Sequence, residues 1–261
     1  MAPAFDIYKA YSRAVQAPAD DVPFLRRVYR EVNGGEPLSF REDFCGGFAN
    51  CCEWVKLDKS YTAVGLDIDP EPIAYGKKHY LSALDRDAAK RITILQRDVL
   101  AAPKTRSDIV CALNFSYSIF KDRPTLLRYF TRVYEGLSKG GVFILDNFGG
   151  PDCFFANTET RKFPDFTYEF EQTYLDPINN YATFAIHFTP KGKRRIKNAF
   201  TYDWRMWSIP EIKDLLLEAG FREAVVYWEG TAPDGSGNGV YKKRSKGDEC
   251  YVWLSYVVGC K

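Results

Sequence analysis

The feature that most constrains this chain is a unit of strand, glycine turn, helix and second strand that ends in an acidic residue. A strand is expected over 38–44, and Gly46 and Gly47 then form the turn before the helix. The second strand, 62–67, ends at Asp67, which follows Gly47 by 20 positions. Nucleotide-binding α/β units use this separation to bring a carboxylate to ribose hydroxyls, and the turn lets a ligand approach the backbone. The unit therefore predicts a site for a nucleoside-bearing ligand, without saying which one.

Strands and helices continue to alternate as far as residue 147. The helix after Asp67 begins with Asp69 as a cap and Pro70 in its first turn, and a further helix over 123–137 has a single apolar stripe. Such alternation predicts a parallel sheet with right-handed crossovers and helices on both faces. The five strands of this sheet are expected over 38–44, 62–67, 91–96, 108–114 and 142–147.

The segment 150–205 has a different pattern. Polar and apolar residues alternate over 169–175 and 181–188, and a third run covers 199–207, with turn residues between the runs. This predicts an antiparallel β insertion after the fifth strand. The chain is then expected to consist of an N-terminal helical cap over 1–37, an α/β domain made of 38–149 and 206–261, and the insert 150–205.

The C-terminal part distinguishes between nucleotide-binding folds. Ser208 and Glu211 form a capping-box pattern for a helix, and two strands follow over 222–228 and 250–259. The segment that joins them, 229–249, is rich in Gly, Lys and Ser and is expected to be a mobile loop without a helix. Because no helix crosses between these strands, they are expected to pair antiparallel, whereas a dinucleotide fold continues with a parallel strand.

Composition limits the partners that this chain can have. The 261 residues include 36 basic and 34 acidic side chains, a net charge of +2, which is no electrostatic footprint for nucleic acid. The basic runs 191–197 and 242–246 fall in expected turns, so we interpret them as solvated hairpin tips, with attraction of an acidic substrate as the alternative. No apolar run is long enough to predict a membrane span.

The cysteines and histidines favour a reduced protein without a metal site. Seven cysteines show no paired spacing, and His79 and His187 are the only histidines. A disulfide framework and a zinc site are therefore disfavoured, and a cytoplasmic location is expected. The N-terminal residues lack the basic and apolar regions of a signal peptide.

Over 38–147 and 208–259 the chain resembles the class I S-adenosylmethionine-dependent methyltransferases, of the type that acts on small molecules. The resemblance implies a Rossmann-like, seven-stranded sheet with five parallel strands and a C-terminal strand pair whose last strand is antiparallel. It also implies S-adenosyl-L-methionine as the cofactor. The inserted sheet stands where related enzymes have an element that covers the substrate.

The same resemblance assigns the cofactor contacts. Asp67 corresponds to the family's ribose-binding acid, although in isolation it could be a helix cap, and Asp98 corresponds to the adenine contact, although it could be an ordinary loop acid. The turn reads Asp-Phe-Cys-Gly-Gly-Phe-Ala where the family has Asp-x-Gly-x-Gly-x-Gly, so only Gly47 falls on a glycine position. The implied cofactor-binding residues are Asp43, Cys45, Gly46, Gly47, Asp67, Ile68, Asp98, Val99 and Asn114.

The implied reaction is methyl transfer to an oxygen or nitrogen atom of a small-molecule acceptor. His187 and Tyr117 are the candidate catalytic residues, although His187 could be a structural residue of the insert and Tyr117 a packed core residue, and Asp146 is a further candidate base. Aromatic residues of the insert could line an apolar acceptor pocket. They are Tyr168, Phe170, Tyr174, Tyr202, Trp204 and Trp207.

Other functions stay open on the sequence alone. A protein or RNA methyltransferase would use the same cofactor, and a non-catalytic cofactor-binding module would work through a partner. A nicotinamide-dependent oxidoreductase is disfavoured by the C-terminal strand pair and by the missing third glycine. A homodimer is possible on the sequence.

Overall fold

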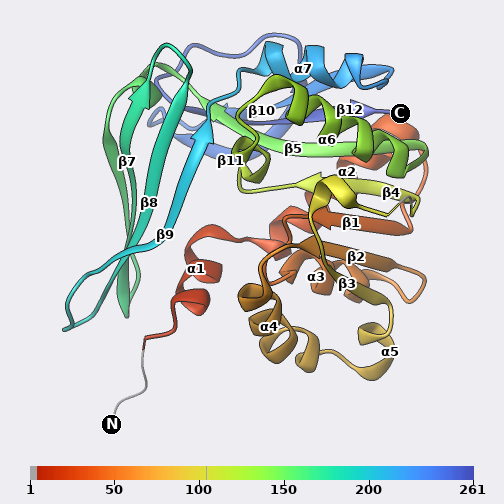
Figure 1. Cartoon of the computed structure of the whole chain (residues 1–261), viewed down its shortest axis with the longest axis horizontal. Coiled ribbons are helices and arrows are strands. Elements are labelled where there is room, and N and C mark those ends of the chain that lie inside the picture. The colour runs from red at the N-terminus through yellow and green to blue at the C-terminus, as the bar shows by residue number, and fades with distance from the viewer. Residues whose placement is uncertain (1–4, 104) are drawn as a thin grey trace.

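The computed structural model describes residues 5–103 and 105–261. Within them the central sheet has eight strands in the order β11-β10-β12-β5-β4-β1-β2-β3 (Figure 1). Strands β1 to β5 run parallel, and β12 pairs antiparallel with both β5 and β10, as predicted. The strands are β1 (Ser39–Asp43), β2 (Thr62–Asp67), β3 (Ile92–Gln96), β4 (Ser107–Ala112), β5 (Leu137–Gly149), β10 (Glu223–Thr231), β11 (Gly237–Arg244) and β12 (Trp253–Cys260).

Strand β11 corrects the prediction of seven strands and of a loop over 229–249. It pairs antiparallel with β10 at the edge of the sheet, and almost all of its side chains are exposed. Only Tyr241 turns inward, where its ring lies 5.5 Å from Phe24 and 4.8 Å from Tyr256. A lysine-rich edge strand of this kind resists pairing with other chains and shows no apolar period by which it could be recognised.

Helices cover both faces of the sheet, as predicted. Alternate residues of one strand face opposite layers, so Ile109 packs with α2, α3 and α4 whereas Val110 packs with α6 and α7. The helices are α1 (Ile7–Val15), α2 (Pro18–Asn33), α3 (Ala49–Leu57), α4 (Pro70–His79), α5 (Arg86–Ala89), α6 (Arg123–Gly136) and α7 (Ile209–Glu218), with short 3₁₀ turns η1 (Leu81–Ala83), η2 (Val99–Ala101), η3 (Ser116–Ile119) and η4 (Pro151–Phe154). None of the described helices is long and apolar enough to cross a bilayer.

The two N-terminal helices have different positions. Helix α2 buries Val22, Leu25 and Val28 completely in the core, so it is a layer of the α/β domain and not a cap. Helix α1 instead packs against the insert. Its Arg13 forms an ion pair with Asp165 at 2.6 Å.

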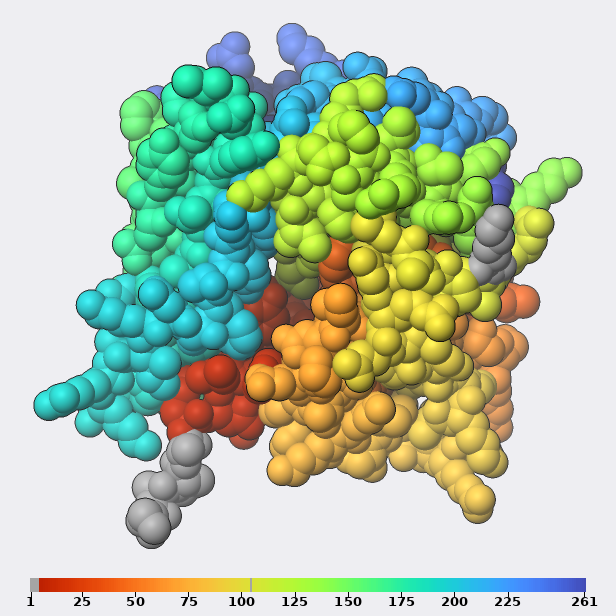
Figure 2. Space-filling view, viewed as in Figure 1, coloured from red at the N-terminus to blue at the C-terminus, as the bar shows by residue number. Residues whose placement is uncertain are grey.

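The insert is a four-stranded antiparallel sheet in the order β6-β7-β8-β9. Its strands are β6 (Asn157–Lys162), β7 (Phe166–Asp176), β8 (Tyr181–Pro190) and β9 (Ile196–Arg205). The prediction missed β6 because all six of its residues are exposed. Figure 1 shows this sheet standing beside the ends of the central strands, with α1 between it and α4. Figure 2 shows the surface hollowed where α1 (red), the β9 region (cyan) and the segment around α4 (orange) meet.

Candidate active site

The glycine turn is tied to the end of β2 by Asp67. Gly46 has a φ of +50°, and its N–H donates to Asp67 Oδ2 at 2.7 Å. Asp67 Oδ1 accepts a second hydrogen bond, at 2.9 Å, from the N–H of Asp69. The cap of α4 is Asp69, which accepts from the N–H of Glu71, so Asp67 is free of the capping role that its position also allowed.

Helix α4 supports this turn through a residue that sequence reasoning missed. A Cβ atom on Gly76 would lie 2.3 Å from the carbonyl oxygen of Gly47. Only glycine permits such close packing of a helix against a turn. The shape of the turn therefore depends on a residue 29 positions away. A glycine inside a predicted helix is the sequence signal that could have indicated this close packing.

A cavity of about 410 Å³ lies over the turn, at the carboxyl ends of β1, β2 and β4. In open α/β sheets this is the edge at which ligands bind. Its lining residues include Tyr8, Tyr11, Glu42, Cys45, Gly46, Gly47, Asp67, Tyr75, Tyr80, Leu113, Asn114, Tyr202 and Trp204. Five of the nine predicted cofactor contacts therefore line it, namely Cys45, Gly46, Gly47, Asp67 and Asn114, and so do the predicted pocket aromatics Tyr202 and Trp204.

The chain after β4 has an unusual backbone conformation that Asp146 holds. Asn114 and Phe115 have φ values of +56° and +57°, which cost side chains other than glycine about 1–3 kcal/mol each. The Asp146 carboxylate accepts hydrogen bonds from both backbone N–H groups, at 2.7 and 2.9 Å. Burial raises the pKa of Asp146 to about 7, although these two bonds act in the opposite direction. Asp146 thus positions the polypeptide at the cavity wall.

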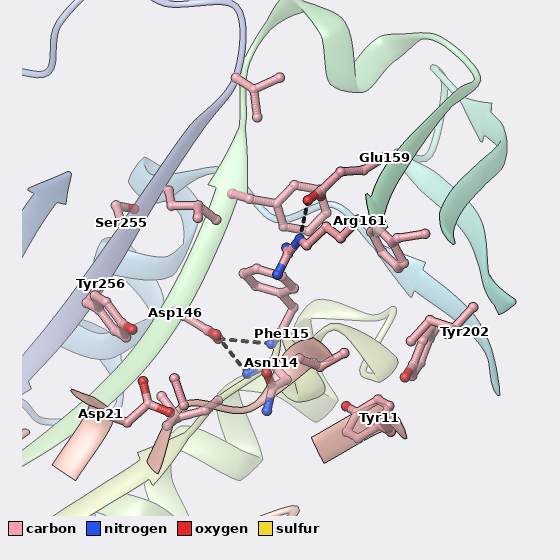
Figure 3. Close-up of a pocket in the computed structure, with 18 of the residues that line it drawn as sticks. Tyr11, Asp21, Asn114, Phe115, Asp146, Glu159, Arg161, Tyr202, Ser255 and Tyr256 are labelled. Carbon is pink, nitrogen blue, oxygen red and sulfur yellow. Dashed lines mark hydrogen bonds and ion pairs between the residues drawn. The ribbon is translucent and has the colours of Figure 1, made fainter. Parts of the chain in front are cut away.

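A second cavity of about 300 Å³ adjoins the first. Tyr11, Leu113, Asn114, Tyr202 and Trp204 line both, so these side chains form the boundary between the two spaces. Figure 3 shows Asp21, Asp146 and Tyr256 on one side of the second cavity and Tyr11 and Tyr202 on the other. The wall is largely aromatic and is supplied by the insert, by α1 and α2, and by the ends of β5 and β12.

The predicted acid at the end of β1 lies elsewhere. The Asp43 carboxylate accepts two hydrogen bonds from the buried Arg41 guanidinium, each of 2.9 Å, and one of 2.9 Å from the Tyr129 hydroxyl. Its neighbour Glu42 lines the first cavity instead. Adjacent strand residues point to opposite faces, so a shift of one position separates the carboxyl that lines the cavity from the one that pairs with Arg41 on the other face.

Three further predicted contacts lie outside both cavities. Asp98 caps η2 by accepting from the N–H of Leu100 at 2.8 Å, which is the alternative role considered for it. Val99 is buried in the core, and Ile68 is 68% exposed beside Asp67. Asp98 and Val99, the predicted contacts that follow β3, therefore line neither of the two cavities.

The two candidate catalytic residues line neither cavity. His187 is 3% exposed, its Nε2 lies 2.7 Å from Glu171 Oε2, and its Nδ1 accepts from the N–H of Asn198 at 2.8 Å. Tyr117 is fully buried and donates to Asn147 Oδ1 at 3.0 Å. Both side chains use their polar atoms inside the protein. Asp21, Tyr11 and Tyr202 reach the cavities in their place.

Comparisons with known proteins bear on the fold. No family model matches the chain, and no curated protein matches it. Among solved structures, an S-adenosylmethionine-dependent methyltransferase from Clostridium acetobutylicum is similar over 97% of this chain and 96% of its own, with a TM-score of 0.69 and 16% identity. DesVI from Streptomyces venezuelae is similar over 98% and 99%, with a TM-score of 0.68 and 15% identity.

This chain has the fold of the class I S-adenosylmethionine-dependent methyltransferases. The sugar N-methyltransferase KedS8 from a Streptoalloteichus species agrees, with a TM-score of 0.66, 18% identity and coverage of 100% and 95%. Coverage near the full length of both partners means that the likeness includes the inserted sheet and the C-terminal strands. The first cavity lies at the carboxyl ends of the parallel strands, and the second lies between that edge and the insert. Among the described residues no cluster of three or more His, Cys, Asp or Glu could hold a metal ion.

Proposed function

We propose that this protein transfers a methyl group from S-adenosylmethionine to an oxygen or nitrogen atom of a small-molecule acceptor. The observation that supports this most is the pair of adjoining cavities with a common wall. One cavity suits the methyl donor and the other suits the acceptor, so that the methyl group passes at the wall. The similar structures include a sugar N-methyltransferase and an amino pentose methyltransferase with bound cofactor.

The residues of the first cavity fit the cofactor. Its volume of about 410 Å³ lies in the range of small-molecule sites. Each Asp67 oxygen accepts one backbone N–H and retains a lone pair for a ribose hydroxyl. Tyr75 and Tyr80 line the cavity where the adenine would lie, and the buried Glu42 carboxyl, which also accepts from Asn50 and Cys51, lines it where the ammonium group of the methionine part would lie.

The chain's own contribution to the reaction is positioning. Bound S-adenosylmethionine supplies a methyl group that its positive sulfur already activates. The side chains at the boundary then have to align the acceptor atom with that methyl group and exclude water. Such alignment can lower the barrier to methyl transfer by several kcal/mol. These side chains are Tyr11, Asn114, Tyr202 and Trp204. The aromatic faces of Tyr11, Tyr202 and Trp204 also stabilise positive charge at the boundary.

The insert and the thiols complete the proposal. Residues 150–205 would act as the element that covers the acceptor, since their side chains line the second cavity. All seven cysteines are free thiols, six of them buried, which favours a reducing compartment such as the cytoplasm. Dimer formation stays a prediction that size-exclusion chromatography with light scattering would test.

The test is a calorimetric titration with S-adenosylhomocysteine, with NADH as the control ligand. We expect the former to bind and NADH not to bind, and Asp67→Ala to weaken binding at least tenfold. Asp85→Ala is a matched control, because Asp85 also accepts two backbone N–H groups but at the cap of α5, away from both cavities. Failure of S-adenosylhomocysteine to bind, or equal weakening by the two substitutions, would contradict the proposal.

A further inference from the structure

The second cavity has an excess of acidic groups. Its charged lining residues are Asp21, Asp146, Glu159 and Arg161. Arg161 donates from Nε to Glu159 Oε1 at 2.6 Å and from Nη1 to the carbonyl oxygen of Ala14 at 2.9 Å. Through these two bonds Arg161 links β6 to the end of α1 and neutralises Glu159. Among the described residues of the cavity wall, no further cationic side chain lies beside the carboxyl groups of Asp21 and Asp146.

Both carboxyl groups are destabilised as anions by their surroundings. Burial raises the pKa of Asp21 to about 6, with a backbone hydrogen bond from Ala17 acting in the opposite direction and the charge of Asp20 adding to the rise. Burial likewise raises the pKa of Asp146 to about 7, and the charge of Asp21 contributes to that rise. A cation placed between the two groups would stabilise both anions.

Asp21 has more capacity for a ligand than Asp146. The Asp146 carboxylate already accepts the N–H groups of Asn114 and Phe115. Asp21 lies in the first turn of α2, and its carboxyl accepts a backbone hydrogen bond from Ala17. Figure 3 shows its carboxyl directed into the space beside Asp146 and Tyr256.

The rest of the wall suits the organic part of a cationic ligand. Aromatic faces within reach of an ammonium group stabilise it through their negative π-systems. One wall residue, Trp204, is 3% exposed and its indole N–H has no partner within residues 5–103 and 105–261. A buried donor without a partner is costly, so this N–H can donate to an acceptor atom on the organic part of such a ligand. The aromatic lining residues are Tyr11, Phe115, Phe148, Tyr168, Phe170, Tyr202, Trp204, Tyr241 and Tyr256.

We propose that the acceptor is a protonated organic amine whose ammonium group binds to Asp21 beside Asp146, so that nitrogen is the methylated atom. This rests on the methyl transfer proposed above. The ammonium group first gives one proton to the Asp21 carboxylate, which exposes the nitrogen lone pair. That pair forms the bond to the methyl carbon while the carbon–sulfur bond breaks and its electrons stay on sulfur. The product is a methylammonium ion and a neutral thioether, and Asp21 releases its proton to solvent.

The test compares two probes that differ only in the charged group, tryptamine and the corresponding alcohol, tryptophol. Each is titrated by calorimetry into the full chain in the presence of saturating S-adenosylhomocysteine. We expect tryptamine to bind at least tenfold more tightly than tryptophol, and Asp21→Asn to remove that preference without weakening tryptophol. Asp20→Asn is the matched control, because it removes the same charge from the same helix turn at an exposed position.

The outcomes separate this inference from the methyltransferase proposal. Binding of S-adenosylhomocysteine with equal affinity for the two probes, or with neither probe bound, would overturn the amine site alone. Equal effects of Asp20→Asn and Asp21→Asn would also overturn it, because the preference would then be a general charge effect. Absence of S-adenosylhomocysteine binding would instead contradict the proposed function. Retention of S-adenosylhomocysteine affinity by Asp21→Asn verifies that the variant is folded.

Discussion

Replacing Glu42 with glutamine should change how the stability of this protein depends on pH. Glu42 is 5% exposed, and its carboxyl accepts from Asn50 Nδ2 at 2.8 Å and from Cys51 Sγ at 3.4 Å. Burial raises its pKa from 4.5 to about 7, and the hydrogen bonds offset only part of that rise. The folded protein therefore keeps a proton on Glu42 over a pH range in which the unfolded chain has lost it.

The sign and size of the effect follow from this difference. Between the two pKa values the native state binds the extra proton, so the free energy of unfolding falls as pH rises. The slope is at most about 1.4 kcal/mol per pH unit, so the interval from 4.5 to about 7 corresponds to about 3 kcal/mol. Glutamine cannot ionise. Glu42→Gln should therefore gain about 2–3 kcal/mol relative to the wild type between pH 5 and pH 8.

Urea unfolding of the cofactor-free protein at pH 5, 6, 7 and 8 measures this difference. Comparing variant with wild type cancels the contribution of Asp146, whose pKa is also raised to about 7. Glu53→Gln, at a partly exposed carboxylate of α3 that pairs with Lys56, is the control and should show no such trend. A difference between Glu42→Gln and the wild type that stays constant across these pH values would refute the reasoning.

Three further predictions test the turn, the strained backbone and the histidine. Gly76→Ala should weaken S-adenosylhomocysteine binding at least tenfold in calorimetry, because its Cβ would lie 2.3 Å from the Gly47 carbonyl oxygen, whereas Gly35→Ala, with nothing within 4 Å, should have no effect. Asn114→Val should lower the free energy of unfolding in urea by about 1–2 kcal/mol and Asn114→Gly should not, because φ is +56° there; equal losses would contradict the strain argument. His187→Gln should cost about 1–3 kcal/mol of stability and leave S-adenosylhomocysteine affinity within twofold, since the ring bonds only inside the insert. A loss of affinity would place His187 in the site.

The strands that sequence analysis found and those it missed differ in how they are held. The five parallel strands bury side chains in two layers and leave an apolar pattern, and β7 to β9 of the insert leave an alternating one. Strands β6 and β11 are edge strands whose side chains are almost all exposed. Backbone hydrogen bonds to β7 and β10 hold these two strands in place. Such bonds form between peptide groups, so they require no particular side chains and produce no sequence pattern.

The parts of the site that could be predicted are those that a short motif defines. Cys45, Gly46, Gly47 and Asp67 belong to one strand–turn–helix–strand unit, and Asn114 ends the next strand of the sheet. The sequence offers His187 both as a candidate base and as a structural residue of the insert, and does not decide between them. Its partners Glu171 and Asn198, which occupy both ring nitrogens, lie on the neighbouring strands, and their pairing with it cannot be read locally.

By itself the sequence determined the order and type of most elements, the parallel sheet with its antiparallel last strand, and the edge at which a nucleoside would bind. These follow from residue periods and turns, which act over a few positions. Only the tertiary structure decided which of two adjacent acids lines a cavity: Glu42 rather than Asp43, and Asp21 rather than Asp20. Adjacent residues carry the same charge in the sequence, and the direction of each side chain is set by helices and strands that pack against it from distant parts of the chain. The two cavities exist only where α1, α2, the insert and the strand ends meet.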